Sequence, residues 1–600
     1  MSARPKQIDG FPNLVSLFFA RVAEGGDKPF LWSKHDRAWT SQSWREVGEQ
    51  VAALAESLRA LGLVAGDRVV IVSENRPEWF IADLGIMAAG CVTVPTYTTN
   101  TERDHQHILD NSGARAVIVS TAKLARTVMP AALRSNITSL IVMEEFKVAQ
   151  QSEVRILDWV DLVGGGADKM AAVEERASSV RRGDLACLIY TSGTGGAPRG
   201  VMQHHGAILH NVEGAAAIVD EDFGIEDEVF LSFLPLSHAY EHSGGQFLPL
   251  MMGAQIYYAE GLEKLVTNME EARPTIMVVV PRLFEVIRAR MLKAVEKQGK
   301  AANFMLRQAL RIGGKGYRGR MGLLDRPMDL VVGKFLRPKI LARFGGRMKA
   351  LVSGGAPLNP EIGIFFYSLG INLLQGYGQT ESGPIIACNR PSAGLKMDTV
   401  GPPVKNTEVR IADDGEICVR GELVMHGYWR NEAESARVLI DGWLHTGDIG
   451  HFDDAGRLVI TDRKKDIIVN DKGDNVSPQR VEGMLTLQPE ISQAMVHGDK
   501  RPNIVAIIVP DPEWAHEWAE TAGLPTDMKL LKEHDKFRSA VRVAVDRVNA
   551  GLSVIERVRK FDFADEPFTI ENEQMTPSLK IRRHVLNALY ADRIAAMYRG

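Results

Sequence analysis

The sequence predicts an α/β protein with a large N-terminal domain of layered sheets and helices, a β-rich subdomain, and a small α+β C-terminal domain. Short β-branched runs alternate with alanine-rich stretches through the first 400 residues, an order typical of largely parallel sheets. Hairpin signals take over after residue 400. The chain of 600 residues is too long for one hydrophobic core, so at least two domains are expected.

The expected strands of the N-terminal domain are short apolar runs. They cover residues 68–72, 116–119, 139–143, 275–280 and 351–353. An alanine-rich helix is expected over residues 51–61. Two hairpins follow, with turns at 413–415 and near 453–456. We expect the domains to span residues 1–464 and 465–600.

The overall composition excludes several classes of protein. Hydrophobic residues make up 45% and charged residues 24% of the chain, as in ordinary globular proteins. The net charge of 71 − 75 = −4 argues against a nucleic-acid binder. Four scattered cysteines support neither a disulfide framework nor a zinc site. With no signal peptide and no long apolar run, a cytoplasmic location is expected.

Residues 282–347 form a basic insertion. They contain 17 Lys/Arg and 4 Asp/Glu, a local net charge of 17 − 4 = +13. A solvated helical segment is the ordinary interpretation of such a run. The alternative is a patch that binds a polyanion, either a substrate or the anionic phospholipid of a membrane with which the protein associates.

The most informative segment is a glycine- and hydroxyl-rich loop. Residues 190–200 read YTSGTGGAPRG after an apolar run. Glycines let a ligand approach the backbone, free N–H groups form an anion site, and Arg199 offers a planar fork for phosphate oxygens. The loop lacks the Walker A lysine and the third glycine of a dinucleotide fingerprint. Polyphosphate binding is therefore expected at Thr191, Ser192, Gly193, Thr194 and Arg199.

A glycine-rich turn follows the strand expected at 351–353. It reads SGGAP over residues 353–357. Glycines let a flat ring lie against the backbone, so a nucleotide base is expected beside Gly354, Gly355 and Ala356. Taken alone, the pattern is more typical of an ordinary strand-to-loop connection.

Residues 375–383 read QGYGQTESG and combine three chemistries. Tyr377 stands between two glycines, which predicts an exposed ring able to stack on a base. Thr380 offers a hydroxyl to phosphate, and Glu381 offers the carboxylate oxygen that Mg²⁺ prefers. The alternative is a polar turn with a solvated glutamate. The nucleotide-binding residues expected here are Gln375, Gly376, Tyr377 and Gly378.

A fourth nucleotide contact is expected at Asp448, which ends the run GWLHTGD. A carboxylate accepts hydrogen bonds from both hydroxyls of a ribose, as acidic residues do in dinucleotide sites. An aspartate in such a turn is also common as a purely structural Asx turn. The residues alone leave both interpretations open.

Taken together, these motifs resemble those of the adenylate-forming superfamily, in order and spacing, from residue 190 to 583. The phosphate loop departs at two positions: Gly195 replaces the usual threonine and Arg199 the usual lysine. The segment TDRKKDII resembles a family motif with two roles. Its arginine contacts the nucleotide, and the residue two positions after that arginine is the pivot between domains. These roles fall on Arg463 and Lys465.

Two further roles are implied by the resemblance. The segment MTPSLKIRR resembles the one that carries the family's catalytic lysine, which here is Lys580. The segment LPLSHAYE resembles the border of the carboxylate pocket, which places His238 there. Thr380 and Glu381 complete the expected catalytic residues. The family rotates a mobile C-terminal domain, so that Lys580 leaves the site and residues 472–478 enter it.

The basic insertion, GQTE at 378–381 and PLSH at 235–238 look most like bacterial long-chain fatty acyl-CoA ligases. The resemblance implies ATP, Mg²⁺, coenzyme A and a fatty acid as ligands. The alternatives are an aryl or medium-chain acid ligase, or a ligase that loads a carrier protein. A non-catalytic acyl-nucleotide-binding protein is the alternative from another class.

Overall fold

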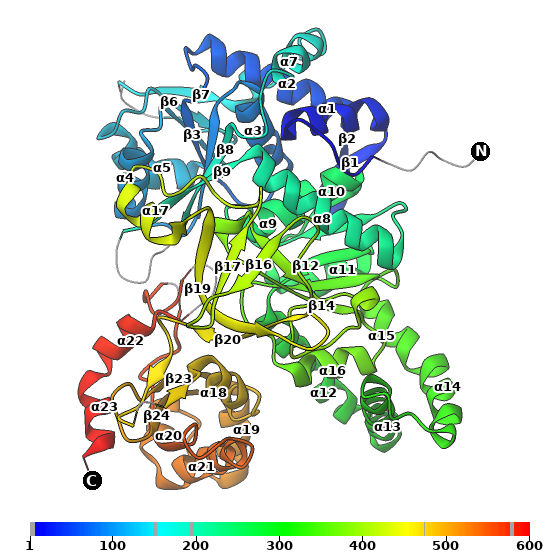
Figure 1. The fold of residues 1–600 in the computed structure, drawn as a ribbon, viewed down its shortest axis with the longest axis vertical. Helices are drawn as coiled ribbons and strands as arrows, with labels where there is room; N and C mark the ends of the chain where they lie inside the picture. The colour runs from blue at the N-terminus through cyan, green and yellow to red at the C-terminus, as the bar shows by residue number, and fades with distance from the viewer. Residues whose placement is uncertain are drawn as a thin grey trace.

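The computed structural model describes residues 7–147, 153–191, 197–472, 474–569, 571–576 and 581–599. Two large, mostly parallel sheets form the body of the molecule (Figure 1). A β-rich subdomain and a smaller C-terminal domain complete it. The predicted α/β class, with a large N-terminal and a smaller C-terminal domain, is confirmed.

The first sheet has seven strands, parallel except for its last pair. In spatial order they are β7 (Arg155–Asp158), β6 (Ser139–Val142), β5 (Ala116–Val119), β3 (Arg68–Val72), β4 (Val92–Thr96), β8 (Leu185–Thr191) and β9 (Arg199–His204). Alternate residues of β3 face opposite sides, as the pleat requires. Val70 packs on one face and Val69 on the other, so both faces are covered by helices.

The second sheet has eight strands and is also parallel in its centre. In order they are β15 (Ile385–Cys388), β14 (Leu373–Gly378), β13 (Ala350–Ser353), β12 (Ile276–Val279), β10 (Val229–Ser232), β11 (Gln255–Tyr258), β1 (Pro29–His35) and β2 (Ala38–Ser43). The edge strands β15 and β2 are antiparallel to their neighbours.

Helices and sheets alternate in layers. One outer layer contains α4 (Glu102–Ser112) and α5 (Ala122–Leu133). The layer between the sheets contains α1 (Leu14–Gly25), α2 (Trp44–Ala60), α3 (Pro77–Ala88), α8 (His205–Phe223) and α10 (Leu248–Met252). This middle layer packs on both sheets within one core cluster. The helix expected at 51–61 is the later part of α2.

The basic insertion folds as helices of the other outer layer. That layer contains α11 (Leu265–Ala272), α12 (Pro281–Lys297), α13 (Lys300–Tyr317), α14 (Arg326–Phe335), α15 (Arg337–Arg343) and α16 (Pro360–Ser368). The expectation that residues 282–347 are helical is confirmed. Their inner face, including the fully buried Phe284, packs on β12 and β13.

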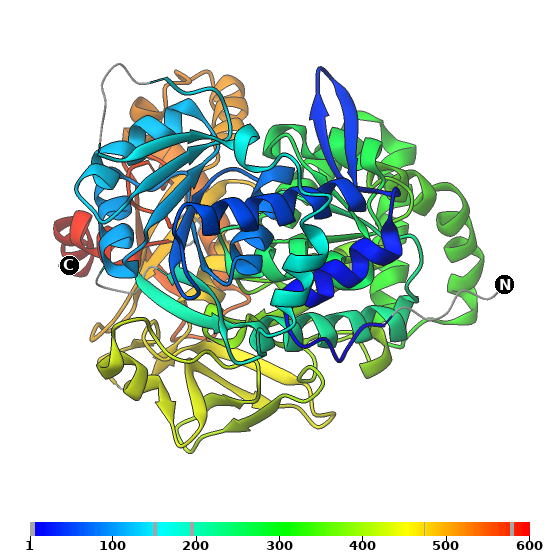
Figure 2. The same ribbon diagram turned by 90° about the horizontal axis from the view of Figure 1, so that it is seen from above.

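The β-rich subdomain contains both predicted hairpins. Its strands are β16 (Glu408–Ile411), β17 (Glu416–Arg420), β19 (Trp443–Phe452), β18 (Leu439–Ile440) and β20 (Leu458–Arg463). The turns fall between β16 and β17 and between β19 and β20, as predicted. Figure 2 shows this subdomain, in yellow, beside the two large sheets.

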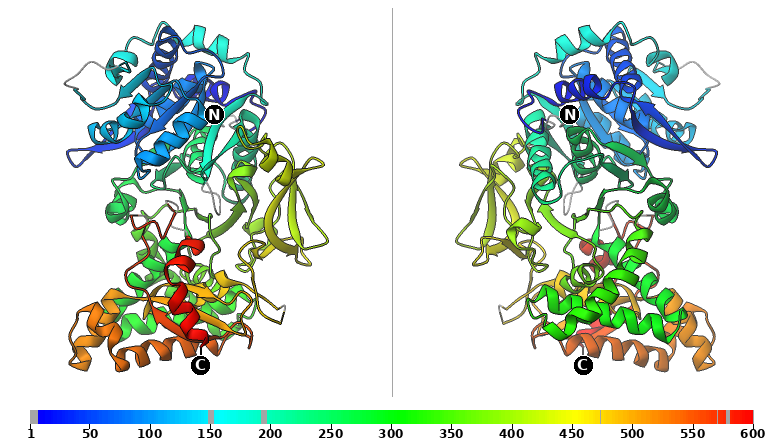
Figure 3. Two further views of the ribbon diagram at one scale, coloured as in Figure 1. Left: turned by 90° about the vertical axis from the view of Figure 1, so that its left-hand side faces the viewer. Right: turned by 90° about the vertical axis from the view of Figure 1, so that its right-hand side faces the viewer.

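The C-terminal domain has its own small core. Its strands are β21 (Ile468–Val469), β22 (Asn475–Val476), β23 (Ile491–His497), β24 (Ile504–Pro510) and β25 (Val558–Phe563). Its helices are α18 (Pro478–Leu485), α19 (Pro512–Ala522), α20 (Met528–Glu533), α21 (Asp535–Asn549), α22 (Arg583–Leu589) and α23 (Ala591–Tyr598). Figure 3 shows these helices at the same end of the molecule as the insertion. Lys293 on α12 pairs with Glu517 on α19 at 2.8 Å.

All four cysteines are buried and unpaired. Within the described ranges no helix is long and apolar enough to cross a membrane.

The packing of the insertion yields a stability prediction. Phe284→Ala removes a fully buried ring and should lower the free energy of unfolding by about 3–5 kcal/mol. Phe304→Ala is the matched control, since that ring is 52% exposed and should change stability by at most about 0.5 kcal/mol. Urea unfolding measures both variants. Equal losses would contradict the assigned packing of α12.

Candidate active site

A cleft of about 3260 Å³ lies among the two large sheets, the β-rich subdomain and the C-terminal domain. Single small-ligand pockets usually occupy about 300–1,000 Å³, so this cleft has room for several ligands. The predicted site residues that line it are Thr191, Arg199, His238, Gly354, Gly355, Ala356, Gln375, Gly376, Tyr377, Gly378, Thr380, Glu381, Asp448, Arg463 and Lys465. Ser192, Gly193, Thr194 and Lys580 lie outside the described residues.

Strand ends bring these residues together. Thr191 ends β8, Gly354 directly follows β13, and Gly378 ends β14. In open α/β sheets ligands bind at the carboxyl ends of parallel strands. The cleft therefore lies where the topology places a ligand site.

Two buried donors at the ends of the 191–199 loop lack a hydrogen-bond partner among the described residues. Thr191 and Arg199 face each other in the β8–β9 ladder, at the two ends of the loop. The Thr191 hydroxyl and the Arg199 Nε are buried without a hydrogen-bond partner among the described residues. A buried unsatisfied polar group costs about 1–3 kcal/mol. Phosphate oxygens would satisfy both donors.

The rest of the Arg199 guanidinium contacts residues that the motifs did not mark. Arg199 Nη1 donates to Glu434 Oε2 at 2.9 Å, and the guanidinium lies 4.4 Å from the Tyr428 ring centroid. Glu434 is therefore a competitor of phosphate for this arginine. Both contacts span more than 200 residues of sequence, and no local pattern signals them.

Tyr428 also connects Arg199 with the expected metal ligand. Its hydroxyl donates to Glu381 Oε1 at 2.8 Å. Burial and the Glu381 carboxylate raise the pKa of Tyr428 above its ordinary value, so the phenol remains a donor. Within the described ranges no group of three His, Cys, Asp or Glu residues could hold a metal ion. The second oxygen of Glu381 could still bind Mg²⁺ together with phosphate oxygens.

The Asp448 carboxylate is held by two donors. Tyr377 donates its hydroxyl to Oδ2 at 2.7 Å, and Arg463 Nε donates to Oδ1 at 3.1 Å. Tyr377 is only 9% exposed, and burial raises its pKa. The expectation of an exposed Tyr377 ring is therefore wrong, because the β-rich subdomain covers it. Each carboxylate oxygen keeps a lone pair for a ribose hydroxyl.

The glycines in the cleft serve different purposes. A Cβ on Gly354 would lie 2.7 Å from the Tyr240 ring, and one on Gly378 would lie 1.7 Å from the Pro384 carbonyl oxygen. Both are required by close protein packing. A Cβ on Gly376 would meet no protein atom nearer than 3.8 Å, so this position has free space beside it.

His238 lines the cleft. It caps the short helix α9 (Ala239–Glu241), and its Nδ1 accepts from the Tyr240 N–H at 3.2 Å. The neighbouring Tyr240 donates to the Val352 carbonyl at 2.8 Å. These bonds fix the wall segment to β13.

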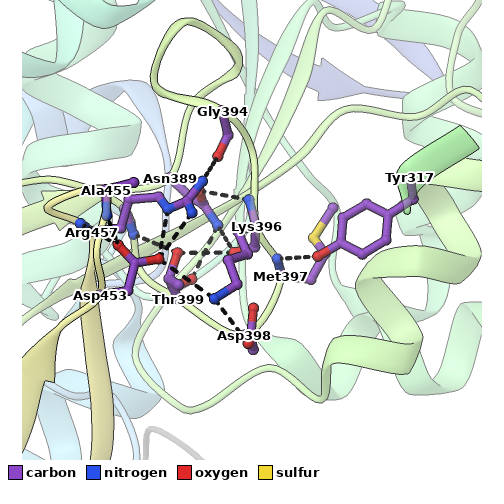
Figure 4. A network of polar contacts seen from close by, with 11 residues as sticks. Tyr317, Asn389, Gly394, Lys396, Met397, Asp398, Thr399, Asp453, Ala455 and Arg457 are labelled. Carbon is purple, nitrogen blue, oxygen red and sulfur yellow. Dashed lines mark hydrogen bonds and ion pairs between the residues drawn. The ribbon is translucent and has the colours of Figure 1, made fainter. Parts of the chain in front are cut away.

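A loop at the margin of the cleft is fixed by a polar network (Figure 4). Arg457 pairs with Asp453 at 2.9 Å, and Asn389 donates to the Thr399 carbonyl at 3.1 Å. The Met397 N–H donates to the Tyr317 hydroxyl at 2.8 Å. Met397 and Thr399 line the cleft, so this network connects the insertion to its wall.

The C-terminal domain supplies the remaining wall. Met575, Thr576 and Ile581, which flank residues 577–580, line the cleft, as do Asn475 and Ser477. Met575 and Ile581 form an isolated antiparallel bridge. The described neighbours of Lys580 and part of the 472–478 segment therefore border the same space as the nucleotide residues.

These features define a two-domain α/β enzyme with a nucleotide cleft, the architecture of AMP-binding enzymes. The AMP-binding enzyme family matches residues 18–429, and the family of AMP-binding enzyme C-terminal domains matches residues 465–600. The chain belongs to the AMP-binding enzyme family.

Relatives cover the full length of the chain. It is 34% identical to a long-chain-fatty-acid–CoA ligase of Mycobacterium tuberculosis, over 99% of this chain and 98% of that enzyme. It is 30% identical to long chain acyl-CoA synthetase 1 of Arabidopsis thaliana, over 99% and 92%.

Among solved structures, the adenylation domain of a carboxylate reductase from Mycobacterium chelonae has a TM-score of 0.74 at 20% identity. The match covers 99% of this chain and 92% of that one. An anthranilate CoA ligase in complex with anthranoyl-AMP has a TM-score of 0.71 at 19% identity, over 98% of both chains. Both likenesses support the fold.

The geometry of Asp448 yields a binding prediction. Asp448→Asn replaces one carboxylate oxygen by an NH₂ group, which cannot accept the hydrogen bond of Tyr377 or Arg463. It also removes the negative charge of the carboxylate. Hydrogen bonds to charged groups contribute about 1.5–3 kcal/mol, so affinity for AMP should fall about 10- to 100-fold in calorimetry.

Asp441→Asn is the matched control, because Asp441 is exposed in the turn before β19 and has φ 51°, which asparagine tolerates. An equal loss of affinity in both variants would contradict the role of Asp448.

Proposed function

We propose that the protein is an ATP-dependent ligase that activates a long-chain fatty acid as an acyl-adenylate and transfers the acyl group to coenzyme A. The observation that carries this proposal is the cleft itself. Thr191, Arg199, Glu381 and Asp448 all line it, and the Thr191 hydroxyl and Arg199 Nε have no hydrogen-bond partner among the described residues. Full-length similarity to long-chain acyl-CoA ligases supports the acid and thiol classes.

The catalytic difficulty is electrostatic, because the substrate carboxylate and the α-phosphate are both anions. Positioned donors and cations lower this barrier. Thr191 and Arg199 would hold phosphate oxygens, Asp448 the ribose and the segment around Gly354 the base. Mg²⁺ bound at Glu381 would supply positive charge to the phosphates. Lys580 would stabilise the charge that develops when the carboxylate attacks and pyrophosphate leaves.

The second half-reaction needs a different arrangement, in which the coenzyme A thiol attacks the acyl carbonyl and AMP leaves. We place the domain boundary between residues 464 and 465, with Lys465 as the pivot. Lys464 pairs with Asp414 at 2.6 Å and Glu416 at 3.2 Å in the N-terminal domain, whereas Lys465 is an exposed residue of the following turn. Rotation there would exchange Lys580 for residues 472–478.

The proposal includes a cytoplasmic location and a set of binding partners. Four buried, unpaired cysteines fit a reducing cytoplasm. The partners are ATP, a fatty acid and coenzyme A, with the insertion 282–347 as the contact with a membrane surface. Nucleic acid is not among them, given the net charge of −4.

Pyrophosphate release tests the function directly. With ATP and Mg²⁺, release should require coenzyme A for turnover and should be fastest with long-chain acids in a panel of fatty and aromatic acids. If release is fastest with aromatic or medium-chain acids, the substrate belongs to that class and not to the long-chain fatty acids. If turnover requires an acyl carrier protein instead of coenzyme A, the carrier protein is the acyl acceptor. If no acid leads to pyrophosphate release, the protein is a non-catalytic binding protein.

The division between half-reactions yields a further prediction. Lys580→Ala should slow adenylation by about 100-fold or more, the cost of losing one transition-state donor. Thioester formation from supplied acyl-adenylate should be retained. Lys529→Ala, an exposed lysine of the same domain, is the control for both assays. Equal loss of both half-reactions in Lys580→Ala would contradict the assigned role.

A further inference from the structure

The basic insertion has an apolar outer corner, which we call the insertion tip (residues 318–335). Twenty large hydrophobic side chains are exposed in the described parts of the chain, and six of them lie in these 18 residues. They are Met321, Leu323, Leu324, Leu330, Val331 and Phe335. Single exposed apolar residues are common, but a contiguous group marks an interaction surface.

Helix α14 shows that this exposure is not a side effect of packing. Its inward residue Val332 is fully buried, whereas Leu330 is 74% and Phe335 is 56% exposed. Leu330 lies four positions before Lys334, and Val331 four before Phe335, so these residues share the outer face. A surface helix normally turns polar residues outward. Here the outer face is mainly apolar.

The turn before α14 is held in place while it displays two leucines. The buried Asp325 carboxylate accepts from the Gly322 N–H at 3.2 Å and from Lys315 at 2.9 Å. Leu323 and Leu324, immediately before it, are 75% and 96% exposed. Because the Asp325 bonds fix the turn, these leucines are presented to the outside.

Exposed cations lie in the same segment as the apolar residues. Arg318, Arg320, Arg326 and Lys334 are exposed, and no described acidic residue pairs with them. Lys334 Nζ lies 5.8 Å from the Phe335 ring centroid. Long basic side chains can keep their charge among phosphates while their stems cover apolar surface.

We propose that the insertion tip docks the protein on an anionic phospholipid surface. Leu323, Leu324 and Phe335 would enter the headgroup layer, while the exposed arginines contact lipid phosphates. A second copy of the chain is a poorer occupant. In a two-fold contact the same unpaired cations would face each other.

The position of the tip suits a ligase that takes its long-chain acid from a bilayer. This use of docking rests on the proposed function, whereas the docking itself does not. Figure 1 shows α14 at the outer edge of the molecule. The insertion begins at the cleft, where Arg282 and Glu285 line it. Tyr317, next to the tip, accepts a hydrogen bond from Met397 at the cleft wall (Figure 4). Docking would therefore hold the cleft near a bilayer, into which long-chain acids partition.

Vesicle co-sedimentation of the full chain, without substrates, tests the electrostatic part. The protein should bind vesicles of phosphatidylcholine with phosphatidylglycerol, and binding should weaken with salt. The double variant Arg318→Gln/Arg320→Gln should have a vesicle–water partition coefficient about 30-fold lower than the wild type, because each arginine contributes a factor of about five. Arg37→Gln/Arg59→Gln removes two exposed arginines elsewhere and should bind like the wild type.

A second pair of variants tests the apolar part. Leu323→Ser/Leu324→Ser should weaken binding by about tenfold for each leucine. Leu262→Ser/Leu530→Ser changes leucines that are 65% and 55% exposed elsewhere and should have no effect. Equal binding by tip and control variants, or equal affinity for pure phosphatidylcholine, would overturn the proposal. So would a wild-type dimer that becomes a monomer in the leucine tip variant.

Because vesicle binding needs no turnover, its failure is distinct from a failure of the proposed ligase activity. The tip variants should release pyrophosphate at the wild-type rate with a water-soluble acid in the absence of vesicles. If they lose that activity, the tip is part of the catalytic fold and the proposal is overturned.

Discussion

The Asp448 carboxylate joins three parts of the molecule. It accepts from Tyr377 at the end of β14 and from Arg463 at the end of β20. These bonds connect the second large sheet, the β-rich subdomain and the segment that leads into the C-terminal domain. A buried carboxylate needs such donors, because burial without them is costly. The nucleotide cleft depends on this point, since its walls come from all three parts.

The phosphate side of the cleft shows the opposite condition. The Thr191 hydroxyl and Arg199 Nε are buried, and neither has a hydrogen-bond partner in the described parts of the chain. Protein interiors rarely tolerate such groups, and in a binding site they provide donors before the ligand arrives. Arg199 is partly occupied by Glu434 and the Tyr428 ring, so phosphate must compete with a protein carboxylate. The arginine that stands where the family has lysine thus makes a second set of contacts.

Much of the fold was predictable because its signals are local. The strands at 68–72 and 116–119 and the hairpin turn at 413–415 follow from β-branched runs and a turn sequence. Glycine and tyrosine spacing also picked out residues that line the cleft, such as Gly376 and Tyr377; their contact with a nucleotide stays a prediction. The exposure of Tyr377 was predicted wrongly. Its burial depends on Ile417, Val419, Leu423 and Leu458, which lie 40 to 81 residues further along the chain.

The sequence alone determined the layered α/β class, the family resemblance and the set of residues predicted to bind the nucleotide, because each rests on short-range patterns of residue type. Only the tertiary structure decided that Tyr428 and Glu434 contact Arg199, and that the basic insertion presents an apolar outer face. Charge can be counted along a chain, but exposure and pairing depend on which distant surfaces meet.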